Sequence, residues 1–329
     1  MPSFDSLPLR LPLKQSLARL GFSTMTAVQN DTLPAILQGR DIVAEAATGS
    51  GKTLAFALGL LETIDPKRFD VQSLILCPTR ELAEQVAKVV RSLASEIGNV
   101  KVLTLCGGVP MKGQIHSLKH GAHIIVGTPG RVLKLLQMDV LNTSHLRIAV
   151  LDEADHMVDM GFIEDITAIL GFAPKKKQLL LFSATYPESI LSLISELAED
   201  PLMIRSQTPL QKNRIEEIAY RCDEKLAAIP DLLVYHKIGN AMVFCNTKIE
   251  TAAICDALNH LGIHSIALHG DMEQFDRNEA IIQFRNGSAT LLVATDVAGR
   301  GIDIDGLDAI INYDIPTQTE RYTHRIGRT

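Results

Sequence analysis

The chain has 329 residues, which is too long for one ordinary α/β core and suits two domains of about 150 residues each. Its composition, 46% hydrophobic and 21% charged, is typical of a soluble globular protein. The formal net charge of −6 argues against a protein that holds nucleic acid by bulk electrostatics alone, so any such contact must come from local groups. With no tryptophan and only 5% aromatic residues, the chain has little material for stacking bases.

Neither an export leader nor a membrane span is expected. Residues 1–14 mix prolines and charged residues with apolar ones, and no apolar run is long enough to cross a bilayer. The five cysteines are scattered and form no C-x-x-C pair, so we expect reduced thiols rather than a zinc site or a disulfide framework. We therefore expect a cytoplasmic protein that does not bind membranes.

The first half of the chain alternates short apolar runs with amphipathic stretches. Residues 80–96 and 131–137 have helical periodicity, and the apolar runs between such stretches have the length of strands. This alternation predicts a parallel sheet covered by helices on both faces. The expected strands are 42–46, 73–77, 101–105, 123–127, 147–151 and 178–182.

A glycine-rich segment, Ala-Ala-Thr-Gly-Ser-Gly-Lys-Thr at 46–53, follows the first expected strand and precedes a helical stretch at 54–64. Its spacing is that of a phosphate loop, in which backbone amides surround a phosphate chain. Lys52 would reach the β and γ phosphates, and the Thr53 hydroxyl would bind Mg²⁺. The alternative is a glycine-rich helix start with no ligand. The expected nucleotide ligands in this segment are Thr48, Gly49, Ser50, Gly51, Lys52 and Thr53.

The run Asp-Glu-Ala-Asp at 152–155 ends another apolar strand. We expect Asp152 to supply the second Mg²⁺ contact and Glu153 to orient or deprotonate a water molecule. The alternative for this pair is an exposed acidic loop. Together with the phosphate loop, the run predicts a nucleoside triphosphatase.

The pattern breaks after Pro201, and residues 205–213 are polar and contain Pro209, which suits an inter-domain linker. The first domain is therefore expected at 1–204 and the second at 214–329. The alternation of strands and helices then restarts, which predicts a second α/β domain of similar design. Its expected strands are 216–221, 241–245, 264–268, 290–294 and 308–312.

Polar residues follow the strands of the second domain, which has no phosphate loop of its own. They are candidates for a site, because ligands of open α/β sheets lie outside the carboxyl ends of the strands. If the two domains face each other, Arg325 and Arg328 could approach a γ phosphate as arginine fingers. The alternative is a basic tail in solvent. The polar residues are Thr295, Asp296, Arg300, Asp303, His324, Arg325 and Arg328.

These motifs, in this order and over nearly the whole chain, resemble those of the DEAD-box RNA helicases, which are ATP-dependent unwinding enzymes with two RecA-like domains. Gly21-Phe22, Thr26 and Gln29 are similar to the family's adenine-recognition segment. The resemblance implies that Phe22 stacks on the base and that Gln29 reads its edge, where a donor lies beside an acceptor. Met25 stands where the family usually has proline.

The resemblance also implies which residues contact RNA and which couple hydrolysis to unwinding. RNA contacts of this kind go to phosphates and ribose hydroxyls, so they position a strand without reading its bases. Asp303 would touch the ribose of the nucleotide, and the coupling residues would be Asp155, Ser183, Thr185 and His324. The RNA-binding residues would be Pro78, Thr79, Arg80, Gly108, Thr128, Gly130, Arg131, Gln274, Arg277, Thr295 and Asp296.

Within the family, the segments 105–108, 243–248, 255–259 and 286–289 look most like the bacterial DbpA subgroup. That subgroup acts in assembly of the large ribosomal subunit, which implies ribosomal RNA as a partner, and it carries a C-terminal RNA-binding domain. The family pattern continues past Thr329, so the resemblance implies that the second domain is incomplete at its C-terminus.

We interpret the chain as the core of a monomeric RNA helicase that binds ATP and Mg²⁺ between its domains and holds single-stranded RNA across both. Lys52, Glu153, Arg325 and Arg328 would carry catalysis. Two rival interpretations are a DNA translocase of the same superfamily and a non-catalytic, ATP-dependent RNA clamp. Comparing RNA with DNA stimulation of ATP turnover tests the first, and phosphate release tests the second.

Overall fold

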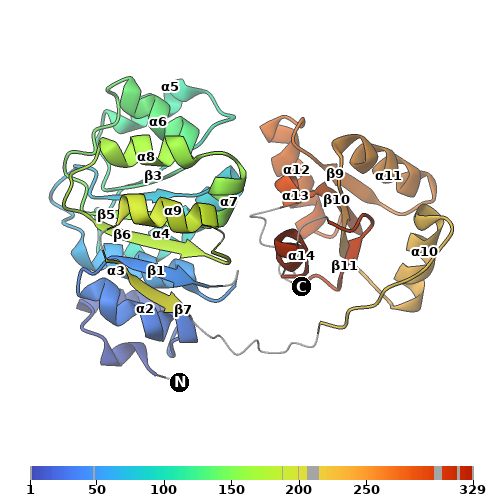
Figure 1. The fold of residues 1–329 in the computed structure, drawn as a ribbon, viewed down its shortest axis with the longest axis horizontal. Helices are drawn as coiled ribbons and strands as arrows, with labels where there is room; N and C mark the ends of the chain where they lie inside the picture. Colours follow the sequence, from blue (N-terminus) through green and yellow to red (C-terminus); the bar gives the residue numbers. More distant parts are fainter. Residues whose placement is uncertain are drawn as a thin grey trace. The chain divides into compact units, whose positions relative to one another are not determined.

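The computed structural model describes residues 2–46, 49–186, 188–198, 200–205, 215–299, 306–316 and 319–327. The chain divides into two compact units, Met1–Leu210 and Gln211–Thr329. Each unit is an α/β domain built on a parallel sheet, which confirms the predicted fold class (Figure 1). No helix among the described residues combines the length and the apolar character that a membrane span needs.

The first unit contains a seven-stranded sheet in the order β3-β4-β2-β5-β6-β1-β7, and its strand pairs are parallel. Strands β2, β4, β5 and β6 are buried along their whole length, which explains their continuous apolar runs. β1 to β6 lie where the sequence predicts strands, whereas β7 was not predicted. The strands are β1 Ile42–Glu45, β2 Ser73–Leu76, β3 Val102–Leu105, β4 Ile124–Gly127, β5 Ile148–Asp152, β6 Gln178–Ser183 and β7 Leu202–Arg205.

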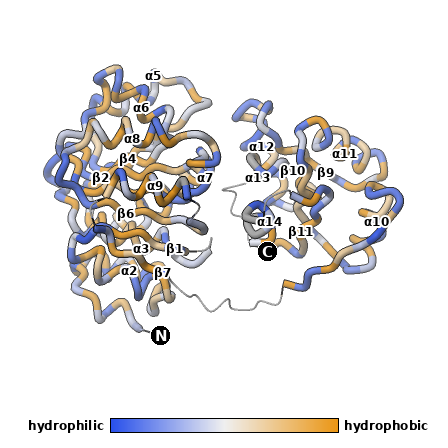
Figure 2. The backbone as a smooth tube through the Cα atoms, viewed as in Figure 1, coloured by the Kyte–Doolittle hydropathy of each residue, from blue (hydrophilic) through white to orange (hydrophobic). Residues whose placement is uncertain are grey.

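Helices cover both faces of this sheet, and alternate residues of a strand pack into different layers. Ile42 and Ala44 of β1 pack with α1 to α4, whereas Val43 packs with the helices from α5 to α9 on the opposite face. Figure 2 shows the strands in hydrophobic colours between these layers. The helices are η1 Phe4–Ser6, α1 Leu11–Arg19, α2 Ala27–Leu37, α3 Lys52–Thr63, α4 Arg80–Ala94, α5 Met111–Leu118, α6 Pro129–Gln137, α7 Ala154–Asp159, α8 Ile163–Gly171 and α9 Glu188–Leu197.

A buried histidine joins the start of β4 to two neighbouring segments. His123 has no exposed surface, and its Nδ1 accepts the backbone N–H of Lys101 at 3.0 Å. Its Nε2 lies 3.3 Å from the carbonyl oxygen of Pro66, so the ring donates from Nε2 and is neutral. The ring packs against Phe69 with 4.6 Å between centroids. Burial lowers the pKa of His123 below its ordinary value of 6.5, because the charged form is desolvated.

We expect the free energy of unfolding of the first unit to fall as the pH drops below about 6.5, because the unfolded chain then binds a proton that folded His123 does not. Above that pH, His123 is neutral in both states and its contribution is constant. His123→Asn keeps an acceptor at the position of Nδ1 but does not titrate. Denaturant unfolding at about pH 7.5 and about pH 5.5 should therefore show a smaller pH effect in the variant. Equal pH effects in both proteins would contradict this role.

The second unit contains a four-stranded parallel sheet in the order β11-β8-β10-β9. Helices α12 and α13 pack on one face, and α10 and α11 pack on the other. The strands are β8 Ala241–Cys245, β9 Ser265–Leu268, β10 Leu291–Thr295 and β11 Ala309–Asn312. The helices are α10 Lys225–Tyr235, α11 Lys248–His260, α12 Gln274–Arg285, α13 Asp296–Gly299 and α14 Thr319–Ile326.

The strand predicted at 216–221 is wrong. None of the described strands pairs with this segment, and Ile218 and Tyr220 remain 47% and 50% exposed. Its apolar residues form a short run at 218–220, but such a run alone supplies neither a neighbouring strand nor a core to cover. In contrast, β7 is a strand that the sequence did not predict. It follows Pro201 and lies at the edge of the sheet, and its residues alternate between partly buried and exposed.

Candidate functional site

Three neighbouring strands of the first unit end at one edge of its sheet. β1 pairs with β6, and β6 pairs with β5, all in parallel. The phosphate-loop segment follows β1, Asp152 and Glu153 lie at the end of β5, and Ser183 ends β6. The fold thus brings residues from three separate sequence motifs to one carboxyl edge, where ligands of such sheets bind (Figure 1).

The phosphate loop enters α3 through two glycines with left-handed backbones. Gly49 has a φ of 77° and Gly51 a φ of 91°, which other residues rarely adopt. A Cβ on Gly51 would lie 2.4 Å from Nε2 of Gln29, so a side chain would also clash there. Lys52 begins α3, and the loop therefore ends at a helix N-terminus that attracts anions. Ser50 is buried in the loop, whereas the expected ligand Thr48 lies outside the described residues.

The ammonium group of Lys52 is buried beside two carboxylates. Its Nζ lies 3.4 Å from Oδ1 of Asp152 and 3.9 Å from Oε1 of Glu153. Burial by itself lowers the pKa of Lys52, but the negative charges of Asp152, Glu153 and Asp155 outweigh it and hold the pKa above its ordinary value of 10.5. Lys52 is therefore a charged donor that can bind phosphate oxygens.

Asp152 can take a further ligand. Both of its carboxylate oxygens are buried, and apart from the ion pair between Oδ1 and Nζ of Lys52, neither these oxygens nor Nζ has a hydrogen-bond partner among the described residues. Burial raises the pKa of Asp152, because its charged form is desolvated. A bound cation would remove this penalty. Mg²⁺ prefers oxygen ligands and is usually held by one or two carboxylates together with substrate phosphates, so Asp152 and the hydroxyl of Thr53 fit this ion.

Glu153 follows β5 and is the N-cap residue of α7, with a left-handed backbone of φ 54° and ψ 53°. Its carboxylate does not cap the helix. Instead, Oε2 lies 2.9 Å from Nδ1 of His156, and Oε1 faces Lys52. The carboxylate is buried, so it can act on a water molecule in a site with little competing solvent.

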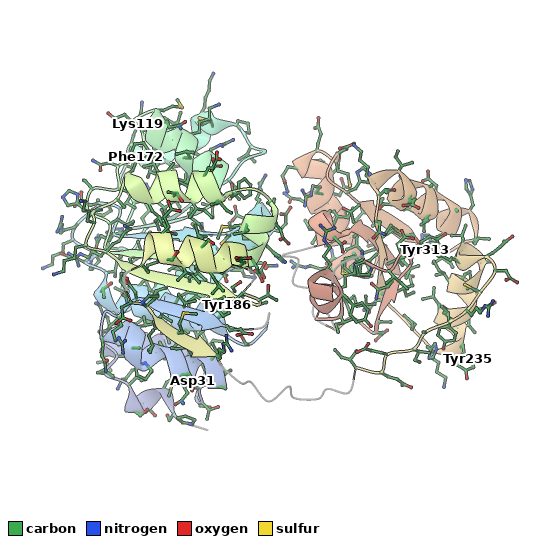
Figure 3. All side chains as sticks on the ribbon, in the orientation of Figure 1. Asp31, Lys119, Phe172, Tyr186, Tyr235 and Tyr313 are labelled. Carbon is green, nitrogen blue, oxygen red and sulfur yellow. The ribbon has the colours of Figure 1, made fainter. Side chains whose placement is uncertain are left out.

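Asp155 connects α7 to the loop after β6. Its Oδ2 accepts the backbone N–H groups of Ala184 and Thr185, at 3.2 and 3.1 Å, and the Thr185 hydroxyl at 3.1 Å. The Ser183 hydroxyl donates to the Thr185 carbonyl and accepts the Asp155 N–H. The structure thus brings three of the four expected coupling residues together. Tyr186, labelled in Figure 3, continues this loop and has a buried hydroxyl. The side chain of His324 is outside the described part of the chain.

Gln29 links the expected adenine-recognition segment to the phosphate loop. Its Oε1 accepts the Thr26 N–H at 2.9 Å, and the Thr26 hydroxyl accepts the Gln29 N–H, which forms a capping box at the start of α2. Nε2 of Gln29 donates to the Gly51 carbonyl at 3.0 Å. Phe22 is 45% exposed, so its ring is accessible to a base that could stack on it. Each of these bonds uses one acceptor site of Oε1 or one N–H of Nε2, so the Gln29 amide keeps a second acceptor site and a second N–H with which it could contact adenine.

The expected RNA contacts of the first unit lie where β2, β3 and β4 end. These strands are neighbours in the sheet, so the segments that follow them share one edge. The Thr79 hydroxyl caps α4, and the Thr128 hydroxyl accepts the Gly107 N–H. The Arg131 guanidinium donates to Gln114 and to the Val109 carbonyl, at 2.8 and 3.0 Å. The grouped candidates are Pro78, Thr79, Arg80, Gly108, Thr128, Gly130 and Arg131.

The candidates of the second unit are arranged around β10 and α12. Thr295 ends β10, Asp296 begins α13, and Gln274 and Arg277 lie in the first turn of α12. Arg300, Asp303 and Arg328 fall outside the described residues. The structure therefore places four of the expected RNA contacts at two element ends of this unit.

Arg325 is buried and holds together the carboxyl ends of three strands. Only 2% of its surface is exposed, and its guanidinium lies over the Phe244 ring, 5.0 Å from the centroid. All three guanidinium nitrogens donate hydrogen bonds within the second unit. The acceptors are the carboxylate of Asp296, the side chains of Asn246 and Asn312, and the carbonyl of Asp314.

Comparison with known proteins assigns both units. Residues 26–193 match the model of the DEAD/DEAH box helicase family, and residues 224–329 match that of the helicase conserved C-terminal domain. The ATP-dependent RNA helicase DbpA of Escherichia coli is 47% identical over 100% of this chain and 73% of its own length. The chain belongs to the DEAD-box RNA helicases. RNA helicase CrhR of Synechocystis is 40% identical over 99% of the chain and 67% of its own length.

Solved structures share the architecture of this DEAD-box helicase. Dbp5 of Saccharomyces cerevisiae bound to RNA and ADP BeF3 matches with a TM-score of 0.86 and 31% identity, over 100% of this chain and 86% of that one. A DEAD box protein from Methanococcus jannaschii matches with a TM-score of 0.61 and 38% identity, over 99% and 89%. The family assignment makes this helicase an ATP-hydrolysing enzyme that acts on RNA.

Two contacts at the proposed nucleotide site of this helicase were not predicted from its sequence. His156 contacts Glu153 at the centre of the site, and Gln29 donates to the phosphate loop. The spacing of His156, three residues after Glu153 in a helical stretch, was the available signal for the first contact, because residues three apart lie on the same helix face. No spacing signals the second contact, which joins residues from different elements.

Proposed function

We propose that this DEAD-box helicase hydrolyses ATP at the carboxyl edge formed by β1, β5 and β6. Lys52 would bind the β and γ phosphates, Thr53 and Asp152 would hold Mg²⁺, and Glu153 would orient the attacking water. When bound, Mg²⁺ would neutralise charge that develops on the phosphate oxygens. The observation that supports this proposal best is the buried cluster of Lys52, Asp152 and Glu153. In this cluster the Asp152 carboxylate oxygens could bind a cation, and the Lys52 ammonium group could bind a phosphate.

We propose that RNA is held through its phosphates and riboses at the ends of β2, β3, β4 and β10, without reading of the bases. Ribosomal RNA during large-subunit assembly is the proposed substrate, and the 47% identity to E. coli DbpA supports it. The monomeric state and the cytoplasmic location stay predictions.

The test compares ATP turnover with fragments of large-subunit ribosomal RNA, with an unrelated RNA of equal length, and with single-stranded DNA. We expect both RNAs to stimulate turnover and DNA to have little effect. Stronger stimulation by one ribosomal fragment would support the proposed substrate. Equal stimulation by every RNA would contradict the proposal that ribosomal RNA is the substrate. Equal stimulation by DNA would contradict the proposal that the protein recognises ribose hydroxyls.

The roles of Asp303, His324, Arg325 and Arg328 also remain proposals. Asp303 would contact the ribose, and His324 would couple hydrolysis to unwinding. Arg328 would act as an arginine finger. For Arg325, the contacts around its guanidinium support a positioning role in the second unit, because a finger would have to release four acceptor groups before it could bind a phosphate.

ATP is expected to bind much more tightly than GTP. Gln29 can offer an amide donor and acceptor to adenine, whereas guanine presents an acceptor where adenine has its amino donor. The measurement is competition of each nucleotide against a labelled ATP analogue. Gln29→Leu should lose most of the discrimination, since leucine has neither group. Comparable competition by ATP and GTP in the unmodified protein would refute the role of Gln29.

A further inference from the structure

A buried histidine lies against the carboxylate proposed to act on water. His156 is in the first turn of α7, only 2% of its surface is exposed, and its Nδ1 is 2.9 Å from Oε2 of Glu153. An ionised carboxylate only accepts hydrogen bonds, so the ring must donate from Nδ1. The other carboxylate oxygen faces Nζ of Lys52 at 3.9 Å.

We propose that His156 is a positioning residue for ATP hydrolysis: its Nδ1–H holds Oε2 of Glu153, so that Oε1 faces Lys52 and the phosphate loop. This inference rests on the proposed role of Glu153. His156 touches neither the nucleotide nor the water in this scheme, and it acts only through the carboxylate that it orients.

The local backbone shows how the Glu153 carboxylate comes to face His156. Glu153 is the N-cap residue of α7, and an acidic side chain at an N-cap normally folds back to accept backbone N–H groups of the first turn. Here no such bond forms, and the carboxylate meets the side chain of His156 instead. Glu153 also has a left-handed backbone, which directs its side chain differently from that of an ordinary helical residue. The side chain of His156, rather than the backbone N–H groups of α7, therefore orients this carboxylate.

His156 also contacts the coupling residue Asp155. The His156 backbone N–H donates to Oδ1 of Asp155 at 3.0 Å, while Oδ2 of Asp155 accepts the groups of the loop after β6. One residue is thus bonded to the carboxylate proposed for hydrolysis and to the carboxylate that contacts the loop proposed for coupling. A displacement of that loop can therefore change the position of the Glu153 side chain through Asp155 and His156.

The experiment compares two substitutions of nearly equal shape. In asparagine, Nδ2 is bonded to Cγ, as Nδ1 is in histidine, so His156→Asn keeps a donor at the same place. His156→Leu has no donor. With saturating RNA, we expect His156→Leu to lower kcat for ATP about tenfold, with KM for ATP within about twofold, because the carboxylate is displaced but the phosphate ligands are not. His156→Asn should keep at least about half of the wild-type kcat.

A double-mutant cycle separates positioning from a general structural effect. If His156 acts through Glu153, then Glu153→Ala/His156→Leu should turn over ATP no more slowly than Glu153→Ala alone, since alanine removes both the carboxylate and its bond to His156. A purely structural loss would multiply with the loss caused by Glu153→Ala. Thermal unfolding of each variant shows whether it is folded, and His156→Ala serves as a second donor-free variant if the leucine does not fit.

Three outcomes would overturn the proposal: a wild-type kcat for His156→Leu and His156→Ala, an equal loss in His156→Asn and His156→Leu, or independent losses in the cycle. The role of Glu153 is tested separately by Glu153→Gln. If Glu153→Gln is slow and His156→Leu is not, only the role of His156 fails. If Glu153→Gln turns over ATP normally, the proposed function itself fails.

Discussion

Glu153→Gln is expected to lower ATP turnover by at least about a hundredfold while nucleotide affinity changes by less than about twofold. The substitution keeps the size of the side chain and an oxygen that His156 can bond. It removes the negative charge that would orient and polarise the attacking water. The phosphate ligands around Lys52 stay in place, so binding should survive. Phosphate release with saturating RNA and ATP measures the first effect, and a labelled ATP analogue measures the second.

Lys52→Ala is the matched comparison, since it removes the partner of the same carboxylates but should show the opposite pattern. Its main effect should be weaker nucleotide binding, because the buried ammonium is the proposed phosphate donor. Equal turnover in the unmodified protein and in Glu153→Gln would eliminate the proposed role of this carboxylate. A normal nucleotide affinity in Lys52→Ala would eliminate the proposed phosphate contact.

Arg325→Ala is expected to destabilise the second unit by about 3–5 kcal/mol. The substitution leaves the Asp296 carboxylate without its buried cation, and it removes the donors that join Asn246, Asn312 and the Asp314 carbonyl. Removing one partner of a buried ion pair is costly because the remaining charge is uncompensated. A loss of this size is a large fraction of the free energy of unfolding of a small domain. Denaturant unfolding followed by circular dichroism measures it.

Arg221→Ala provides the control, because Arg221 is exposed in the same unit and its loss should change stability by less than about 0.5 kcal/mol. Arg325→Lys should also be destabilising, since an ammonium cannot reproduce the planar set of donors. If Arg325→Ala lost RNA-stimulated ATP turnover but kept the unfolding curve of the unmodified protein, the arginine-finger role would stand and the positioning role would not.

The sequence predicts most of the fold because its strands are buried on both faces. Such strands appear as uninterrupted apolar runs, and β2, β4, β5 and β6 were located by this signal. β7 was missed because an edge strand needs no such run. The segment 216–221 was wrongly predicted because its short apolar run does not reveal whether a neighbouring strand exists.

In the site, residues within one sequence motif could be predicted, whereas contacts between different elements could not. Lys52, Thr53, Asp152 and Glu153 could be predicted as site residues because the motifs that contain them have fixed spacing. The burial of Arg325 was not foreseen, since arginine is almost never fully buried unless it is paired, and its partners come from other elements. The hydrogen bond from Gln29 to Gly51 joins two motifs, so it could not be predicted from the sequence of either motif alone.

The left-handed backbone of Glu153 implies a conflict between stability and activity at one position. Glycine or asparagine tolerates this conformation better than glutamate, for which it costs on the order of 1 kcal/mol. A sequence selected for folding alone would therefore favour one of the smaller residues there. That glutamate stands at this position points to selection for what its carboxylate does, because the strain is tolerated in exchange for a group that neither smaller residue carries.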